Sequence, residues 1–511
     1  MAPRATGLDA LWMSSERNRP DGAAIVTSAS RLEYRALGER TRGLATGLVE
    51  RGGVKRGTVV AVLLPNGAEF VITYFAIAHA GGTVQPIDER LQPDEVQAML
   101  RDSGAEGLIV HGVLAPRIAR LRDEPGSLRW MLGVDLDDPG VERWKDWCAT
   151  PSRALPEAQP GDVAELMYTS GTAGEPKAVS RSHENVLAAS HNSILGFGYR
   201  PDDTILIMMP LSHSSALNSQ MVPLLELGGT LVLLDRFSVR GALETIRTEQ
   251  VTCMRAVPAM LRALLTAPDF RGEDLPSLRL IVNSSAAIDR ETFVELKRRF
   301  AAIEVMNSYG LTEASTCTVL RDDEVLRRPD SIGVPIEGVG MTLRDASGNE
   351  VGEGEEGEIW VRGPHVFVGY RGRPGLRESV MHDGWLRTGD LAHRDADGYF
   401  YLHGRRDDVI DCGGRKFAPQ EVEQTIEQLE GVAEAAVIGI PHRMLGQVAK
   451  AFVVARPGAR IEPRAVIQHC QRKLASHKVP FAVEVVADLP RNSLGKLLRR
   501  RMQPDAVGGA A

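Results

Sequence analysis

Helical and strand patterns alternate through the first four hundred residues, and this alternation constrains the fold more than any other feature. Residues 34–50 carry apolar side chains at helical spacing, residues 59–64 are typical of a buried strand, and residues 68–80 predict an apolar helix. Strands that alternate with helices form parallel sheets with crossover connections. The expected fold class is therefore α/β, with layered sheets of parallel type and helices in a large N-terminal domain.

The pattern changes after about residue 331. Short strands bounded by glycine at 357–363 and 398–404 predict a small β-rich subdomain over about residues 331–404. A compact mixture of helical and strand patterns follows. We therefore expect an N-terminal domain over residues 1–404 and a small α+β C-terminal domain over residues 405–511.

Composition excludes several classes of protein. The net charge is −7 over 511 residues, which argues against nucleic acid as the main partner. The five cysteines are scattered and form no Cys-x-x-Cys pair, so neither a disulfide framework nor a zinc site is expected. No signal peptide or long apolar run is apparent. A cytoplasmic enzyme with no membrane partner is expected, and its oligomeric state stays open.

The segment 168–177 reads Tyr-Thr-Ser-Gly-Thr-Ala-Gly-Glu-Pro-Lys and follows a short apolar run. Glycines let the backbone approach a bulky anion, hydroxyls donate hydrogen bonds, and a lysine adds positive charge. The candidate phosphate-binding residues are Thr169, Ser170, Gly171, Thr172, Gly174 and Lys177. The common P-loop is excluded because Pro176 precedes the lysine and Ala178 follows it. The alternative is a solvated turn.

A second cluster, residues 307–313, also follows an apolar run and is expected at a strand end. Tyr309 can cover an aromatic base, Thr312 can bond a phosphate, and Glu313 can hold Mg²⁺. Three later motifs contain Asp390, Arg405 and Lys496. Each motif alone has an ordinary alternative, such as a helix cap, a turn or a solvated charge.

Together and in this order, the motifs resemble those of the adenylate-forming superfamily of acyl-CoA synthetases, peptide-synthetase adenylation domains and luciferases. The resemblance extends from about residue 32 to residue 496. It implies that a carboxylate attacks the α-phosphate of ATP, giving an acyl-adenylate and pyrophosphate. A second nucleophile, usually the thiol of CoA or of a carrier protein, then displaces AMP. Two anions meet in the first step, so the site must supply positive charge and orientation.

The resemblance also implies roles for individual residues. The phosphate-binding residues named above would hold the β- and γ-phosphates, Thr312 would contact the α-phosphate, and Glu313 would bind Mg²⁺. Asp390 and Arg405 would hold the ribose, and Lys496 would bridge the carboxylate and the α-phosphate in the transition state. The remaining nucleotide-binding residues would be Ser284, Ser285, Ala286, Asn307, Ser308, Tyr309 and Gly310.

In this superfamily the small C-terminal domain is mobile and rotates between the two half-reactions. Asp407 matches the hinge position. The rotation would bring Gly413 and Gly414 beside the pantetheine channel, and Arg415 and Lys416 would be candidates for the phosphates of CoA. Solvated surface cations are the alternative for the last two.

Three positions depart from the usual pattern. Ala173 removes one hydroxyl from the phosphate-binding segment, and Ala178 replaces a common glycine. Asp411 stands where many relatives carry lysine, which weakens inference about the second step from that position.

The acyl pocket is expected after the strand at 205–209, where His213 matches a position near the substrate carboxylate. This region and the segments at 283–287 and 307–308 are rich in serine and asparagine. A fatty-acid pocket should be apolar, because buried methylene groups gain free energy only against apolar walls. A small or polar acid is therefore expected, such as a hydroxylated or amino-substituted aromatic acid. The alternative is that these polar groups face the nucleotide or each other.

An acid–CoA ligase is the leading hypothesis, with ATP, Mg²⁺ and CoA as the expected cofactors. One rival is a stand-alone adenylation enzyme that loads a carrier protein or forms an amide. A second rival is a diazotase-like enzyme of specialised metabolism that activates nitrite.

Overall fold

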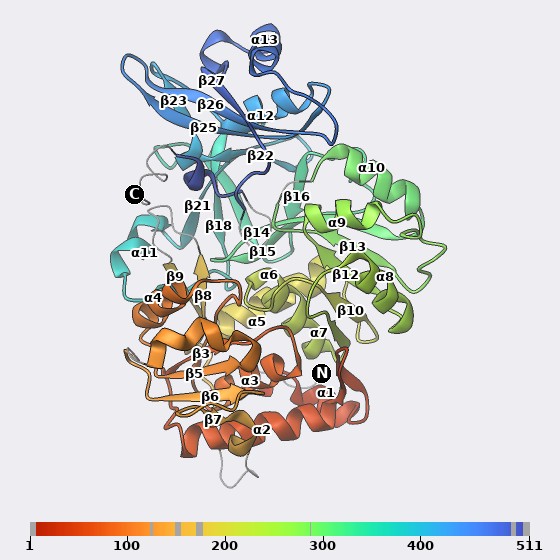
Figure 1. Ribbon diagram of the computed structural model, residues 1–511, viewed down its shortest axis with the longest axis vertical. Helices are drawn as coiled ribbons and strands as arrows, with labels where there is room; N and C mark the ends of the chain where they lie inside the picture. Colours follow the sequence, from red (N-terminus) through yellow and green to blue (C-terminus); the bar gives the residue numbers. More distant parts are fainter. Residues whose placement is uncertain are drawn as a thin grey trace. The chain divides into compact units, whose positions relative to one another are not determined.

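The computed structural model describes residues 7–122, 126–148, 155–169, 177–286, 288–491 and 497–503. The chain forms two compact units (Figure 1). The first comprises Met1–Met341 and Val361–Leu386, and the second comprises Thr342–Trp360 and Arg387–Ala511. The second unit thus includes a segment ahead of residue 405, and the boundary expected at that residue stays a prediction. No helix within the described ranges is long and apolar enough to cross a bilayer.

One sheet of the first unit is parallel through its middle. Its strands follow the order β2-β1-β11-β10-β12-β13-β14-β15-β16. Their bounds are β1 Ala23–Val26, β2 Arg31–Glu33, β10 Thr204–Ile207, β11 Thr230–Leu233, β12 Cys253–Ala256, β13 Leu280–Asn283, β14 Glu304–Leu311, β15 Ser315–Leu320 and β16 Ser331–Pro335. Strands β1, β11, β10, β12, β13 and β14 pair in parallel, and the strands at both edges are antiparallel.

A second sheet of this unit has the order β19-β9-β8-β4-β3-β5-β6-β7 (Figure 1). The bounds are β3 Val59–Leu63, β4 Thr83–Pro86, β5 Gly107–His111, β6 Trp130–Val134, β7 Glu142–Arg143, β8 Val163–Thr169, β9 Lys177–Ser182 and β19 Gly369–Tyr370. Strands β8, β4, β3, β5 and β6 pair in parallel, whereas β9 runs antiparallel to β8. The α/β class is confirmed, but the reversal at β9 was not expected from the alternating pattern.

Two helices of the first unit agree closely with the predicted ranges, α2 Tyr34–Glu50 and α3 Ala68–His79. The others include α4 Pro93–Ser103, α5 His183–Phe197, α6 Ser214–Ala216, α7 Val222–Leu227, α8 Val239–Thr248, α9 Pro258–Leu265 and α10 Arg290–Arg299. Helix α4 begins at a capping box in which Glu95 Oε2 accepts a hydrogen bond of 2.8 Å from the backbone N–H of Gln92. A π-helical turn, η4 (Leu217–Met221), lies between α6 and α7.

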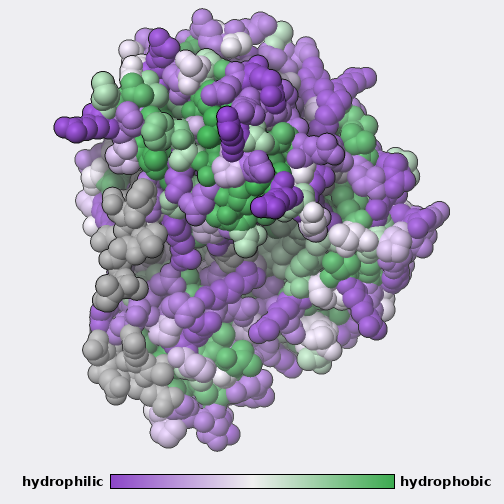
Figure 2. Space-filling model, turned by 45° about the horizontal axis from the view of Figure 1, so that its top comes forward, coloured by the Kyte–Doolittle hydropathy of each residue, from purple (hydrophilic) through white to green (hydrophobic). Residues whose placement is uncertain are grey.

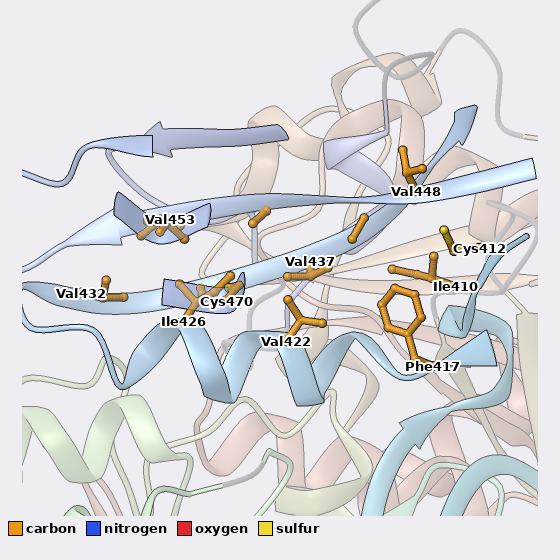
Figure 3. Packing of buried hydrophobic residues seen from close by; sticks show 14 residues of the cluster. Ile410, Cys412, Phe417, Val422, Ile426, Val432, Val437, Val448, Val453 and Cys470 are labelled. Carbon is orange, nitrogen blue, oxygen red and sulfur yellow. The ribbon is translucent and has the colours of Figure 1, made fainter. Parts of the chain in front are cut away.

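The second unit has its own core against a sheet that is antiparallel except for its last strand, which pairs in parallel with its neighbour. Its elements are β21 Trp385–Arg394, β22 Phe400–Arg405, β23 Ile410–Cys412, β24 Arg415–Phe417, α12 Pro419–Glu427, β25 Val432–His442, β26 Gly446–Ala455, α13 Pro463–Lys473 and β27 Ala482–Val486. Figure 3 shows Val422 and Ile426 of α12 pointing toward the strands, where Val437 and Val453 are buried. Hydrophilic and hydrophobic side chains are interspersed on the face of the molecule in Figure 2. The small α+β domain expected near the C-terminus is therefore present.

Candidate active site

Two of the phosphate-binding candidates, Thr169 and Lys177, lie at the ends of adjacent antiparallel strands. Thr169 is the last residue of β8, and it pairs across the antiparallel ladder with Lys177, the first residue of β9. Ser170, Gly171, Thr172 and Gly174 lie outside the described residues. The motif thus joins two strands of one sheet instead of leading from a strand into a helix.

Tyr370 connects the two motifs, and the sequence alone did not point to it. Its hydroxyl donates a hydrogen bond of 2.9 Å to Glu313 Oε1. The Nζ atom of Lys177 lies 5.7 Å from the centroid of the Tyr370 ring, within the range of a cation–π contact. Strand β19 holds Tyr370 in place by pairing it with Val179 of β9. The only signal in the sequence is a Gly-Tyr pair, which is too short to predict a strand.

Residues 307–313 form the end of β14 and its turn into β15. Asn307 is buried, and its Nδ2 donates to the carbonyl of Ser331 at 3.1 Å. The amide of Asn283 donates to Asn307 Oδ1 at 2.9 Å, and Ser308 Oγ donates to the Asn283 carbonyl at 3.1 Å. Three of the polar groups expected to line the acyl pocket therefore bond to one another. Tyr309 and Thr312 are half-buried, and Gly310 is exposed.

The segment after β13 is sharply turned. Asn283 Nδ2 also lies 3.1 Å from the carbonyl oxygen of Ala286, and Ser285 adopts a left-handed conformation with φ of 69°. Ser284 Oγ lies 3.4 Å from Ser215 Oγ, which brings the two expected walls of the acyl site together. Ala287 lies outside the described residues.

His213 stands immediately before helix α6. Its Nε2 lies 3.2 Å from Asp88 Oδ2, a partner that the sequence did not reveal. Asn66 fixes the start of the same segment, because its Oδ1 accepts from the Leu211 N–H at 2.9 Å and its Nδ2 donates to the Met209 carbonyl at 3.0 Å.

In the second unit, Asp390 and Arg405 face each other across the β21–β22 ladder. Arg405 Nε lies 3.5 Å from Asp390 Oδ1, and Arg405 Nη2 donates to the Thr388 carbonyl at 3.1 Å. The sequence places these residues fifteen positions apart, and the hairpin brings them together. Asp407 is exposed in the short helix η5 (Arg406–Asp408) that follows.

Gly413 and Gly414 form the two-residue turn between β23 and β24, with φ of 63° and 82°. Positive φ at both positions is typical of a type I′ hairpin and favours glycine. Asp411, the position that departs from lysine, accepts a hydrogen bond of 2.9 Å from the Gly414 N–H. Arg415 and Lys416 are exposed on β24.

An open cavity of about 400 Å³ lies beside this turn. Its lining residues are Cys412, Gly413, Arg415, Leu445, Val448, Ser476, His477, Val479 and Phe481. Lys496 and residues 492–495 lie outside the described residues, whereas Arg491 and Leu497 on either side form an isolated β-bridge.

Comparison with known proteins identifies the family. The model of the AMP-binding enzyme family matches residues 13–371, and that of the AMP-binding enzyme C-terminal domain matches residues 421–496. The chain belongs to the AMP-binding enzyme family. A feruloyl-CoA synthase from Amycolatopsis sp is 34% identical over 97% of this chain and 98% of its own length.

Solved structures agree with this membership. ATP-bound MatB from Rhodopseudomonas palustris has a TM-score of 0.89 at 29% identity, covering 98% of both chains. The anthranilate CoA ligase AuaEII in complex with anthranoyl-AMP has a TM-score of 0.87 at 28% identity, covering 98% of this chain and 97% of its own. The AMP-binding enzyme described here is thus an ATP-dependent, AMP-forming ligase of the acyl-CoA synthetase type.

Proposed function

We propose that this AMP-binding enzyme is an acid–CoA ligase. It activates a small or polar carboxylic acid as an acyl-adenylate, releases pyrophosphate, and transfers the acyl group to CoA. The observation that carries the proposal is the contact of Tyr370 with both Glu313 and Lys177, because it draws the expected metal ligand and the expected phosphate ligand to one place.

We assign the nucleotide-binding roles from the resemblance of the motifs to those of the family. Thr169 and Lys177, with Ser170, Gly171, Thr172 and Gly174, bind the β- and γ-phosphates, and Thr312 contacts the α-phosphate. Asp390 and Arg405 hold the ribose. The proposed adenine and pocket residues are Ser284, Ser285, Ala286, Asn307, Ser308, Tyr309 and Gly310.

Glu313 is the proposed ligand of Mg²⁺. A carboxylate oxygen suits this hard cation, and Tyr370 orients the carboxylate through Oε1. In the described part of the chain, no group of three His, Cys, Asp or Glu side chains could hold a metal ion. Oxygen atoms of the ATP phosphates would supply further ligands, as is usual for Mg²⁺ at nucleotide sites. When bound, Mg²⁺ neutralises charge that develops on the leaving pyrophosphate.

The remaining proposed roles concern the carboxylate and the acceptor. Lys496 stabilises the transition state of the first step, His213 helps to position the carboxylate, and Asp407 acts as the hinge of the mobile C-terminal domain. The cavity beside Gly413, Gly414 and Arg415 is the proposed contact with CoA, and Lys416 adds charge at its edge.

An aromatic acid is the proposed substrate class. Relatives named for feruloyl-CoA and for anthranilate support this choice, because both names denote aromatic acids with a polar substituent. Asn283, Asn307 and Ser308 bond to one another, so fewer polar groups remain to contact the acid. We therefore expect the acid to make only one or two polar contacts with the pocket.

The test measures release of AMP and pyrophosphate across a panel of carboxylic acids and nitrite, with and without CoA. We expect CoA to raise turnover with the best acid and an acyl-CoA thioester to accumulate. Lys496→Ala is the control and should bind ATP without releasing pyrophosphate. Turnover that is indifferent to CoA would favour a carrier protein or an amine as acceptor, and turnover with nitrite alone would favour a diazotase-like enzyme.

A further inference from the structure

Arg255 is a buried cation for which the described residues supply no counter-charge. It lies on β12, and only 3% of its surface is exposed. Its Nη2 donates to Ser308 Oγ at 3.2 Å, whereas Nε and Nη1 have no hydrogen-bond partner among the described residues. The guanidinium also stacks on Phe197, at 4.5 Å from the ring centroid.

A second buried guanidinium in the same unit, that of Arg181, is paired with a buried carboxylate. Arg181 is fully buried, and its Nη1 lies 3.6 Å from Glu165 Oε1. Glu165 is itself held by Tyr74 and Asn218. Both side chains leave Nε without a partner, but Arg181 has a carboxylate beside it, and no charged group among the described residues plays that part for Arg255. A buried charge is costly unless it is paired, so an anion from a bound molecule would stabilise Arg255.

Among the described residues, the titratable group that interacts with Arg255 is the phenol of Tyr199. The hydroxyl of Tyr199 donates to the Ser219 carbonyl at 3.1 Å, and burial raises its pKa far above the usual range, so it stays neutral. Burial also lowers the pKa of Arg255, in the direction expected for a cation without an anion beside it.

The position of Arg255 points to the acid and not to the nucleotide phosphates. In the ladder Arg255 pairs with Val282 of β13 and with Ile207 of β10, near the carboxyl ends of these parallel strands. Ligands of open α/β sheets bind beyond such ends. Ser308, which Arg255 contacts, belongs to the proposed acyl wall, and Ser219 belongs to the turn that continues the His213 segment.

We propose that Arg255 is a specificity-determining residue that pairs with a second carboxylate on the acid, remote from the carboxylate that is activated. The preferred substrate class is therefore a dicarboxylic acid. A guanidinium matches a carboxylate by charge and by its planar set of donors, and the carboxylate would satisfy nitrogen atoms that are otherwise buried without partners. This inference rests on the proposed function, because it names the substrate of the same site.

The test compares benzoates and cinnamates that carry a hydrogen, a hydroxyl or a carboxylate at the same ring position, with pyrophosphate release as the readout. A site built around a buried polar group rejects analogues that lack its partner, so wild type should prefer the carboxylate series by about 100-fold or more in kcat/KM. Arg255→Met should remove this preference and leave the unsubstituted acids within about threefold of wild type. Arg255→Lys should retain part of it, because the charge is kept without the planar donors.

The controls are ATP binding and thermal unfolding of each variant. Equal loss with every acid in Arg255→Met would mean that the arginine is only structural, and a wild-type preference for the hydroxyl series would overturn the assignment of a carboxylate. If Arg255→Met does not fold, the wild-type comparison alone decides, since equal turnover of all three series contradicts the proposal. Failure of every acid to release pyrophosphate would instead contradict the proposed function itself.

Discussion

The candidate residues of the two units are held in different ways. In the first unit, Glu313 and Lys177 meet on Tyr370, and this contact is fixed by short strands of a large sheet. In the second unit, Arg415 and Lys416 extend from an exposed two-residue turn whose side-chain support is Asp411. Glu313 and Lys177 are thus held by contacts with neighbouring strands, whereas Arg415 and Lys416 lie beside an exposed hairpin turn.

This difference corresponds to the two half-reactions proposed above. Stabilising a transition state requires donors and charges that are already oriented before the reaction, because reorientation would cost part of the stabilisation. Binding of the acceptor after the first step does not require groups that are oriented as strictly. Changes in the first unit should therefore have large effects on adenylation, and changes at the turn should have small effects limited to the second step.

Replacing Glu313 should have the largest effect. Glu313→Gln removes the negative charge proposed to bind Mg²⁺ and keeps the shape of the side chain. We expect pyrophosphate exchange to fall by a factor on the order of 10²–10³, as for loss of one oriented electrostatic group. The measurement is ATP–pyrophosphate exchange as a function of Mg²⁺ concentration.

Tyr370→Phe is the matched control, because it removes the hydroxyl that bonds to Glu313 and keeps the ring near Lys177. A hydrogen bond to a charged group contributes about 1.5–3 kcal/mol. The exchange rate should therefore fall less in Tyr370→Phe than in Glu313→Gln. Exchange rates of Glu313→Gln within threefold of wild type would remove Glu313 from the nucleotide site.

Buried histidines should make the first unit sensitive to acid. His365 is fully buried, and burial, with repulsion by Arg181, lowers its pKa to about 4. The unfolded chain takes up this proton near its ordinary pKa of about 6.5, so the contribution to stability is complete above that pH and is lost as pH falls toward 4. The cost is about 1.4 kcal/mol per pH unit within this window.

His365→Leu should therefore reduce the loss of stability between pH 6.5 and 5 by about 2 kcal/mol. The measurement is denaturant unfolding at both pH values, followed by a probe specific to the first unit. His79, whose pKa burial also lowers to about 4, remains in the variant, so some acid sensitivity should persist. An unchanged pH dependence would show that His365 is not buried in its neutral form.

Sequence patterns could predict the elements of this molecule because each helix and strand has a local signature. Residues 34–50 were expected to be helical from their periodicity, and α2 has those bounds. The order of strands has no such signature. The reversal of β9 against β8 depends on pairing between strands, and it sets Thr169 opposite Lys177.

The candidate site shows the same limit. Motifs identified Glu313 and Lys177 separately, but Tyr370 lies 57 residues beyond Glu313, and only the pairing of β19 with β9 brings it there. No motif singled out Arg255, a cation within the short strand β12. Its missing partner becomes apparent only when the surrounding side chains are placed.

A substitution in the turn should have a smaller effect. Gly414→Ala places a Cβ atom where nothing lies within 4 Å, so the cost arises from the φ of 82° and not from a clash. An L-residue in this conformation costs about 1–2 kcal/mol. We expect thioester formation to slow by about tenfold while pyrophosphate exchange is unchanged.

Gly348→Ala serves as the matched control in the same unit. Its φ is 87°, and a Cβ there also meets nothing within 4 Å, so both variants should lose similar stability in thermal unfolding. Only Gly414→Ala should slow the step that uses CoA. If both variants slow that step equally, the effect belongs to the stability of the unit and the turn has no role in binding CoA.

The smallest effect is expected for Arg415→Ala. Arg415 is exposed beside the cavity, and contacts between exposed charges contribute about 0.2–1 kcal/mol, so KM for CoA should rise by at most about fivefold. The increase should shrink at high ionic strength, because salt screens exposed charges, whereas kcat for adenylation should not change. Arg464→Ala, an exposed arginine on α13, controls for the loss of net charge. A tenfold or greater rise in KM that persists in high salt would mean that Arg415 is enclosed when CoA binds, and the contrast between a rigid first site and an open second one would then no longer hold.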